Sequence, residues 1–213
     1  MFWLFYWFIF IVALIPIWLL RVKIINKKNM PKKKEKCLVA SNHLSMWDPM
    51  IFHVKFGRRF RALAKKELFK NWFMSCVMKT LGGIPVDREK MSPSTYKAVM
   101  NAFEKDKQVL IFPEGTRNKT EEEGLQEAKN GVIIFASKAD VPIVPVVIYR
   151  KPKLFRKNYM IVGEPFKVEG ENPKRLTKEE IEANVEKYSK IMADLRKQID
   201  EKLSKKKSKK DKK

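Results

Sequence analysis

The chain begins with one long apolar run and continues with short apolar segments separated by helical patterns. Residues 2–20 contain no charged side chain. A helix of that length extends about 28 Å, roughly the thickness of the hydrocarbon core of a bilayer. The pattern therefore predicts a membrane segment over residues 1–21.

This segment has two possible arrangements. The length of the run and the basic residues from Arg21 onward favour a helix that spans the bilayer, with the following chain on the cytoplasmic face. A helix buried in one leaflet is the alternative, because aromatic residues crowd its start and Pro16 can kink it. A cleaved signal peptide is disfavoured, since lysines rather than small residues follow the run.

The remainder of the chain alternates between strand and helix patterns. Five short apolar runs predict β-strands, and several are apolar enough to be buried on both faces. They are Cys37–Ala40, Phe60–Ala64, Val109–Phe112, Ile143–Ile148 and Tyr159–Gly163. Four helical patterns are Asp48–Phe56, Leu68–Leu81, Ser94–Lys105 (with the start signal Ser92-Pro93) and Asn130–Lys138. The alternation predicts an α/β fold, a single mixed β-sheet domain flanked by helices.

A final amphipathic helix is predicted near the C-terminus. Thr177 and Glu180 form a capping box, which marks a helix start. Apolar residues then recur at alternating spacings of four and three, and they are Ile181, Val185, Tyr188, Met192, Leu195 and Ile199. Packing of this stripe on the domain is favoured over a coiled-coil seam or a helix that lies on the membrane.

These patterns divide the chain into five predicted parts. The parts are an N-terminal membrane segment (1–21), a basic linker (22–36), an α/β domain (37–170), a C-terminal helix (171–203) and a lysine-rich, disordered tail (204–213).

Positive charge is concentrated at the two flanks of the domain. The formal net charge is +22, and 45% of residues are hydrophobic, which excludes collagen-like and wholly disordered chains. Residues 21–36 hold eight Lys or Arg residues against Glu35, and residues 202–213 hold eight lysines against Asp211. Such tracts bind anionic membrane lipids. Nucleic acid is disfavoured as a partner, because arginine–aromatic interleaving and recognition motifs are absent from the sequence.

The cysteines give no sign of a metal site. Cys37 and Cys76 lie far apart without Cys-x-x-Cys spacing, and no other cluster of metal-ligating residue types is present in the sequence. The sequence therefore predicts neither a disulfide framework nor a bound metal.

Candidate chemistry first appears in the polar loop after the strand Cys37–Ala40. His43 lies in this loop and Asp48 lies in the first turn of the next helix. A carboxylate that accepts from one imidazole nitrogen leaves the other free to take a proton from a bound hydroxyl. Ser45 is interpreted as the helix cap rather than as a nucleophile. A buried or capping role for this histidine is the alternative to a catalytic one.

A second polar loop follows a second apolar strand, residues 109–112. Pro113 and Gly115 shape a turn, Glu114 is an acceptor for a hydroxyl or a cation, and Arg117 can bind a phosphate with two hydrogen bonds. An ordinary surface turn is the alternative interpretation of this loop.

Several blocks in order resemble the glycerolipid acyltransferase family that acylates glycerol phosphates and lysophospholipids. Asn42-His43 with Asp48 is similar to its His-x-x-x-x-Asp motif, and Phe112-Pro113-Glu114-Gly115-Thr116-Arg117 to its acceptor-binding motif. Two further blocks are Lys65-Lys66-Glu67-Leu68-Phe69 leading to Gly82-Gly83-Ile84-Pro85-Val86-Asp87-Arg88, and Val141-Pro142-Ile143-Val144-Pro145-Val146. The resemblance spans residues 37–165, and its ordered set of blocks is far more specific than any single block.

The resemblance implies transfer of an acyl group from acyl-CoA or acyl carrier protein to a lysophospholipid hydroxyl, with no cofactor or metal. The lysophospholipid implied is 1-acylglycerol-3-phosphate, and glycerol-3-phosphate or another lysophospholipid is the alternative acceptor. His43 and Asp48 are then the catalytic pair. The implied substrate-binding residues are Lys66, Arg88 and Arg117 at the phosphate, Glu114 at the glycerol, and Gly115 and Thr116 in the same motif.

A non-catalytic role remains as a rival interpretation. A basic protein that coats anionic membranes through its lysine tracts is compatible with the net charge alone. Release of free thiol from acyl-CoA only when an acceptor lipid is present would distinguish an enzyme from such a coat.

Overall fold

The computed structural model describes residues 2–87, 92–105, 107–118 and 125–210. Its described strands form one sheet in the order β1-β7-β6-β2-β5-β3-β4. The strands are β1 (Lys23–Ile25), β2 (Cys37–Ser41), β3 (Arg61–Lys65), β4 (Ile84–Val86), β5 (Gln108–Ile111), β6 (Ile143–Ile148) and β7 (Tyr159–Val162). The only antiparallel pair among them is β6 with β7, so the sheet is mixed, as predicted.

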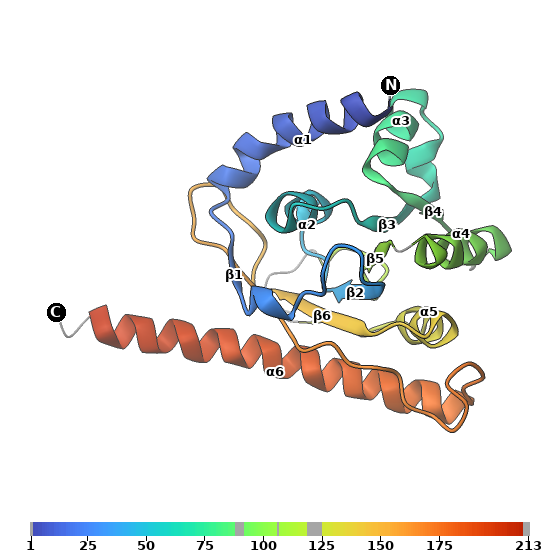
Figure 1. The fold of residues 1–213 in the computed structure, drawn as a ribbon. Coiled ribbons are helices and arrows are strands. Elements are labelled where there is room, and N and C mark those ends of the chain that lie inside the picture. The colour runs from blue at the N-terminus through green and yellow to red at the C-terminus, as the bar shows by residue number, and fades with distance from the viewer. Residues whose placement is uncertain (1, 88–91, 106, 119–124, 211–213) are drawn as a thin grey trace.

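Helices cover both faces of the sheet (Figure 1). The α-helices are α1 (Phe2–Leu19), α2 (Asp48–Phe56), α3 (Trp72–Leu81), α4 (Pro93–Glu104), α5 (Gly131–Ala139) and α6 (Lys178–Lys210), and the 3-10 helices are η1 (Lys27–Asn29) and η2 (Lys66–Phe69). One core lies between the sheet and α4, α5 and α6. A second core lies between the other face, α2 and the end of α1.

The central strands are buried on both faces, as their uninterrupted apolar sequences predict. In β2, Leu38 and Ala40 face the core under α4 to α6, whereas Cys37 and Val39 face the core under α2. Every residue of β2, β5 and β6 is buried. A parallel sheet covered by helices requires this pattern. Because β2, β5, β6 and β3 run parallel to one another, they end at one shared edge, here called the carboxyl edge.

One predicted helix differs in the structure, and two short strands were not predicted. The predicted helix 68–81 is divided into η2 and α3, since the side chain of Asn71 accepts a hydrogen bond from Met74 N and caps a new helix start. The three-residue strands β1 and β4 were not predicted, and β1 lies within the predicted linker 22–36. Its exposed Lys23 is typical of an edge strand.

The C-terminal helix confirms its predicted start and its packing. Thr177 and Glu180 exchange side-chain-to-backbone hydrogen bonds of 2.8 and 3.2 Å, which is the capping box. The buried residues Tyr188, Met192, Leu195 and Ile199 pack on the sheet. The helix continues to Lys210, beyond the predicted end at residue 203, because no Gly or Pro interrupts the Lys-rich sequence.

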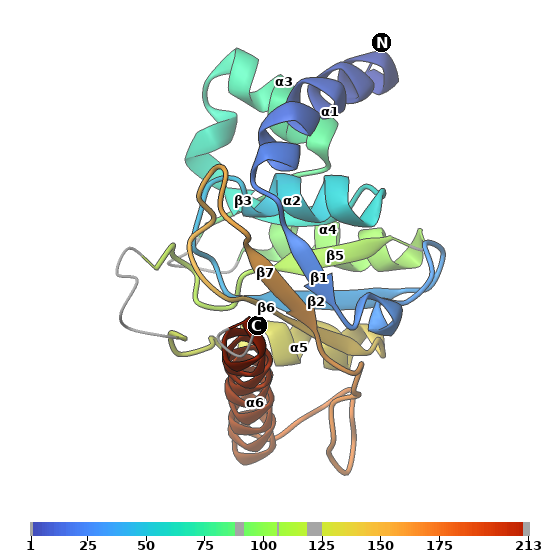
Figure 2. The same cartoon turned by 90° about the vertical axis from the view of Figure 1, so that its left-hand side faces the viewer.

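The N-terminal helix lies along the outside of the molecule, beside α2 and α3 (Figures 1 and 2). Ile17 and Leu20 near its end are buried in the core, whereas Leu4, Ile11, Ile15 and Trp18 are exposed. Within the described residues, no helix has the length and apolar character needed to cross a membrane.

Candidate active site

The chain entering the candidate site is fixed by the buried side chain of Asn42, directly after β2. Its Nδ2 donates to Ile148 O at 2.9 Å, and Ile148 N donates to its Oδ1 at 2.7 Å. These two bonds replace the backbone pairing that β2 loses as it leaves the sheet. They also tie the carboxyl end of β2 to that of β6 immediately before His43.

His43 and Asp48 form a hydrogen-bonded pair at the start of α2. His43 Nδ1 lies 2.8 Å from Asp48 Oδ2, and the same oxygen accepts from Leu44 N and Ser45 N, each at 2.7 Å. Asp48 is fully buried, and its position in the first turn of the helix favours a negative charge. With Nδ1–H directed at the carboxylate, Nε2 carries the lone pair and can accept a proton.

The plane of the imidazole is held by Phe112, the residue after β5. The two rings stack with centroids 4.2 Å apart and an interplanar angle of 21°. Phe112 also meets Phe52 of α2 edge to face. The ring of His43 is therefore constrained by a hydrogen bond on one edge and by an aromatic ring on one face.

The second polar loop is joined to the first by backbone hydrogen bonds. His43 N donates to Glu114 Oε2 at 3.3 Å, and Asn118 N donates to His43 O at 2.8 Å. Gly115 permits the turn, because its φ of 72° lies in the left-handed region and its N–H donates to Phe112 O. The structure thus brings Asp48 and Glu114 into contact with His43.

Burial raises the pKa of Glu114 from its ordinary value of 4.5 to about 7. The hydrogen bonds from the backbone N–H groups of His43 and Gln126 lower this pKa, and the nearby charge of Asp48 raises it. Burial dominates because a carboxylate loses its hydration there. Glu114 therefore changes its charge close to neutral pH.

The raised pKa of Glu114 predicts a pH-dependent stability. The folded chain binds the proton of the Glu114 carboxyl more tightly than the unfolded chain does. This protonation therefore stabilises the folded chain fully below pH 4.5, and the stabilisation is lost as pH rises through about 7. Relative to Glu114→Gln, we expect the free energy of unfolding of the wild type to fall by about 2 kcal/mol across this window, allowing for partial solvent screening. Urea unfolding in detergent at a series of pH values measures the difference, and a difference independent of pH would contradict the assignment.

The other predicted binding residues that the structure describes, Thr116, Arg117 and Lys66, follow strands that end at the same edge. Thr116 and Arg117 are exposed in the turn between Gly115 and Asn118. Lys66 is exposed at the start of η2, directly after β3, and its side chain makes no contact with His43 or Glu114 among the interactions of the described residues. Arg88 lies outside the described residues. Of the three cations predicted to bind phosphate, the structure therefore describes Arg117 and Lys66, which follow the adjacent strands β5 and β3.

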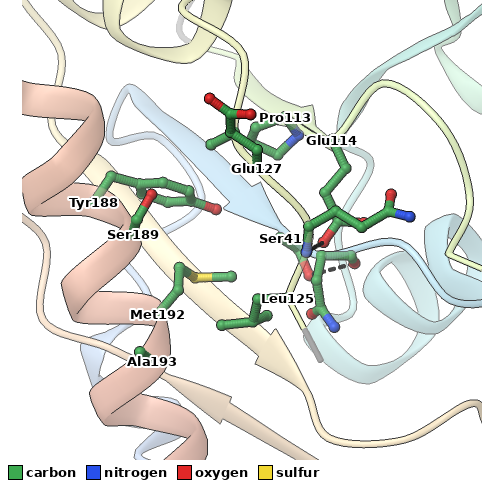
Figure 3. A pocket seen from close by; sticks show the side chains of 12 residues that line it. Ser41, Pro113, Glu114, Leu125, Glu127, Tyr188, Ser189, Met192 and Ala193 are labelled. Carbon is green, nitrogen blue, oxygen red and sulfur yellow. Dashed lines mark hydrogen bonds between the residues drawn. The ribbon is translucent and has the colours of Figure 1, made fainter. Parts of the chain in front are cut away.

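A cavity of about 260 Å³ opens beside Glu114 on the side of α6 (Figure 3). Ser41 and Glu114 line it from the carboxyl edge, and Tyr188 and Met192 point into it from α6. Leu125 lies opposite Met192 and adds to an apolar lining. The polar end of this cavity therefore adjoins the candidate site, while its walls suit an apolar group.

Sequence reasoning missed the contribution of α6 and the interaction of Asn118 with His43. Tyr188 and Met192 belong to the predicted apolar stripe, whose spacing is the same for packing and for lining a cavity. Asn118 acts through its backbone N–H, for which no residue type is a signal. The stacking of Phe112 on His43 could have been inferred only from the pairing of β2 with β5.

Ser45 does not cap α2, contrary to the interpretation from sequence. The N-cap position is Trp47, and Ser45 Oγ instead accepts from Trp47 N at 3.2 Å in the preceding turn. The reason is local: Asp48 occupies the first helical position and its own carboxylate accepts from Leu44 N and Ser45 N. The helix therefore starts three residues after Ser45.

We expect Ser45→Ala to retain turnover. The change removes one neutral hydrogen bond, which costs about 1 kcal/mol of stability, and leaves kcat/KM within about threefold of the wild type because no reacting group is lost. Steady-state kinetics and thermal unfolding measure the two effects. A loss of turnover comparable to that of a His43 variant would instead identify Ser45 as a nucleophile.

The comparisons with known proteins agree with this geometry. The model of the family described as Acyltransferase matches residues 21–149. The 1-acyl-sn-glycerol-3-phosphate acyltransferase of Bacillus subtilis is 32% identical over 151 residues, covering 68% of this chain and 73% of that protein. The enzyme of the same name from Borreliella burgdorferi is 34% identical over 148 residues, covering 68% of this chain and 58% of its own length. The chain thus spans less than two thirds of the second relative.

The fold has a counterpart among solved structures. The crystal structure of the 1-acyl-sn-glycerophosphate acyltransferase from Thermotoga maritima superposes with a TM-score of 0.64, covering 92% of this chain and 80% of that one. Sequence identity in this comparison is 22%, so the likeness concerns the fold.

Proposed function

The chain belongs to the Acyltransferase family, and we propose that it transfers a fatty acyl group from a thioester donor to the free hydroxyl of 1-acylglycerol-3-phosphate, forming phosphatidic acid. The product is a precursor in phospholipid biosynthesis. The observation that carries this proposal is the bond between His43 Nδ1 and Asp48 Oδ2, which leaves Nε2 as a base.

The reaction needs one base and no covalent intermediate on the protein. His43 Nε2 accepts the proton of the acceptor hydroxyl as its oxygen attacks the thioester carbonyl. The C–S bond breaks when the tetrahedral intermediate collapses, and the imidazolium returns its proton to the leaving thiolate. Asp48 stabilises the imidazolium, which forms next to its buried carboxylate.

Other residues near the site support direct attack. Ser45 Oγ is engaged by Trp47 N. Burial raises the pKa of Cys37 to about 12, so this thiol stays protonated and is a poor nucleophile. The nucleophile is then the acceptor hydroxyl, whose proton His43 accepts. The balance of the step requires neither a cofactor nor a metal.

The phosphate of the acceptor is assigned to the cations at the carboxyl edge. Arg117 is exposed and lies one residue from Asn118, whose N–H is bonded to His43 O. A planar guanidinium can bind a phosphate through two hydrogen bonds. We assign Lys66 and Arg88 to the same phosphate and Glu114 to the glycerol. Gly115 and Thr116 are assigned to the turn that carries Glu114 and Arg117.

The acceptor and its product are lipids, so we place the carboxyl edge at a membrane. The outward face of α1 is apolar, with Leu4, Ile11, Ile15 and Trp18 exposed, while Ile17 is buried in the domain. Lipid contact along this face would bury apolar surface that is otherwise exposed to water. The basic residues of the segment 22–36 favour the cytoplasmic face and anionic headgroups.

A panel of acceptors tests the proposed function. Purified protein is incubated with acyl-CoA and, separately, with lysophosphatidic acid, glycerol-3-phosphate and lysolipids of other headgroups, and free thiol is measured. We expect release only with lysophosphatidic acid. Release with another acceptor would replace the proposed substrate, and salt-sensitive membrane binding without any thiol release would support the non-catalytic basic protein.

A further inference from the structure

We propose that the segment between β6 and β7, residues 149–158, is a second membrane contact that inserts its apolar tip beside α1. This segment is called the β6–β7 loop below. The inference rests on the membrane association proposed above and specifies how the carboxyl edge meets the lipid. The occupant of this surface is the headgroup region of an anionic membrane.

The composition of the β6–β7 loop fits an anionic interface. It contains five cations and no acidic residue, and the cations are Arg150, Lys151, Lys153, Arg156 and Lys157. At its tip lie Leu154 and Phe155, which are 50% and 71% exposed. An apolar tip flanked by cations matches the boundary between acyl chains and anionic headgroups, where apolar rings insert and basic side chains reach phosphate.

The tip of the β6–β7 loop is held in one conformation by hydrogen bonds. The buried side chain of Asn158 spans the loop, donating from Nδ2 to Lys153 O at 2.9 Å and to Arg156 O at 3.1 Å, and it also donates to Leu20 O. Phe155 has a φ of 60°, a conformation that a bulky residue adopts only when its surroundings impose it. These hydrogen bonds thus fix the loop in a shape that exposes the large apolar side chain of Phe155 to solvent.

The tip is continuous with the apolar face of α1. Phe155 N donates to Leu19 O at 2.9 Å, which joins the tip to the last residue of the helix. The preceding residue, Trp18, is 74% exposed. Figures 1 and 2 both place the loop at the C-terminal end of α1. A membrane in contact with α1 at this end would also meet Phe155.

The other end of the loop begins at the candidate site. The loop follows Ile148, whose backbone is bonded to the side chain of Asn42, the neighbour of His43. Met46 and Trp47, between His43 and Asp48, are exposed at the same edge. Insertion of Phe155 would therefore bring the base close to the level at which a lysolipid hydroxyl lies.

A fluorescent probe at position 155 tests the contact directly. In a Cys76→Ser background, with Cys37 buried in the core, Phe155→Cys is labelled with an environment-sensitive dye. Vesicles of phosphatidylcholine and phosphatidylglycerol are then added. We expect a blue shift of the emission and quenching by lipids that carry a spin label in the acyl chain. The same label at the exposed Ile134 of α5, on the other side of the sheet, should show neither change.

The result that would overturn the inference is an unshifted spectrum at position 155 while the protein sediments with the same vesicles. Binding to membranes would then occur without the loop. A shift that is equally large with vesicles of phosphatidylcholine alone would overturn the anionic specificity that the five cations carry.

A kinetic test separates this inference from the proposed function. For Leu154→Asp with Phe155→Asp, we expect turnover on vesicles to fall about tenfold, since the two side chains no longer contribute to partitioning, and turnover with monomeric lysolipid in detergent to stay at the wild-type level. Ile134→Asp is the matched control and should be unaffected in both assays. Equal losses in detergent and on vesicles would contradict a membrane role, whereas a wild type that is inactive on every lysolipid would defeat the proposed function and leave the fluorescence result standing.

Discussion

Replacing His43 by alanine is expected to lower kcat at least about a hundredfold, because a positioned general base contributes roughly two to four orders of magnitude. The imidazole is held by Asp48 on one edge and by Phe112 on one face, and alanine removes the nitrogen that accepts the proton of the hydroxyl. Steady-state release of thiol from acyl-CoA, with lysophosphatidic acid as acceptor, measures the change.

Two controls make this result specific to proton transfer. Membrane binding should stay near the wild-type value. Stability should fall by about 1–3 kcal/mol, because the buried carboxylate of Asp48 loses one of its three hydrogen bonds, and thermal unfolding measures this loss separately from the change in kcat. The conservative variant His43→Gln keeps the size of the side chain and should be as inactive as alanine. A variant at this position that retains more than about a tenth of the wild-type rate would rule out His43 as the base that the mechanism requires.

Changing Asp48 to asparagine is expected to lower both turnover and stability. In the wild type, Oδ2 accepts three hydrogen bonds and Oδ1 is buried without a partner among the described residues. An asparagine amide must direct its NH₂ either toward the three donors or into the site of Oδ1, and both arrangements leave a buried donor unsatisfied. We expect a stability loss of about 1–3 kcal/mol and a fall in kcat of at least about a hundredfold, as the wrong tautomer of His43 is favoured.

The double variant distinguishes an orienting role from a merely structural one. If Asp48 acts through His43, removing both side chains should cost little more turnover than removing His43 alone, since residues that act as a unit are not additive. Unfolding in urea reports the stability loss separately. Turnover of Asp48→Asn close to wild type, despite lower stability, would show that the carboxylate only anchors the loop and the helix.

The candidate pair could be predicted because its geometry is local. His43 and Asp48 are five positions apart, and a strand end followed by a helix start leaves few ways to arrange them. Glu114 was assigned to the same site only by the family resemblance, and in the structure its Oε2 accepts a hydrogen bond from His43 N. Ser45 was misinterpreted as a cap, since the competing acceptor, Asp48, lies at the first helical position.

The parts that could not be predicted depend on packing between distant elements. The strands β1 and β4 have three residues each, too few for a period to be recognised. The split between η2 and α3 depends on whether Asn71 caps a helix or lies within one, and its sequence neighbours allow both. The cavity beside Glu114 requires α6 to cross the carboxyl edge, which the apolar stripe alone does not specify.

The side chain of Asn42 is hydrogen-bonded to the backbone of Ile148, which lies 106 residues later in the sequence. The loop bearing His43 therefore receives its shape only after Ile148 has emerged from the ribosome, because β6 must dock beside β2 first. Contacts so distant in sequence also form late in folding. During synthesis, the apolar N-terminal helix is therefore exposed well before the loop that carries His43 can take its folded shape.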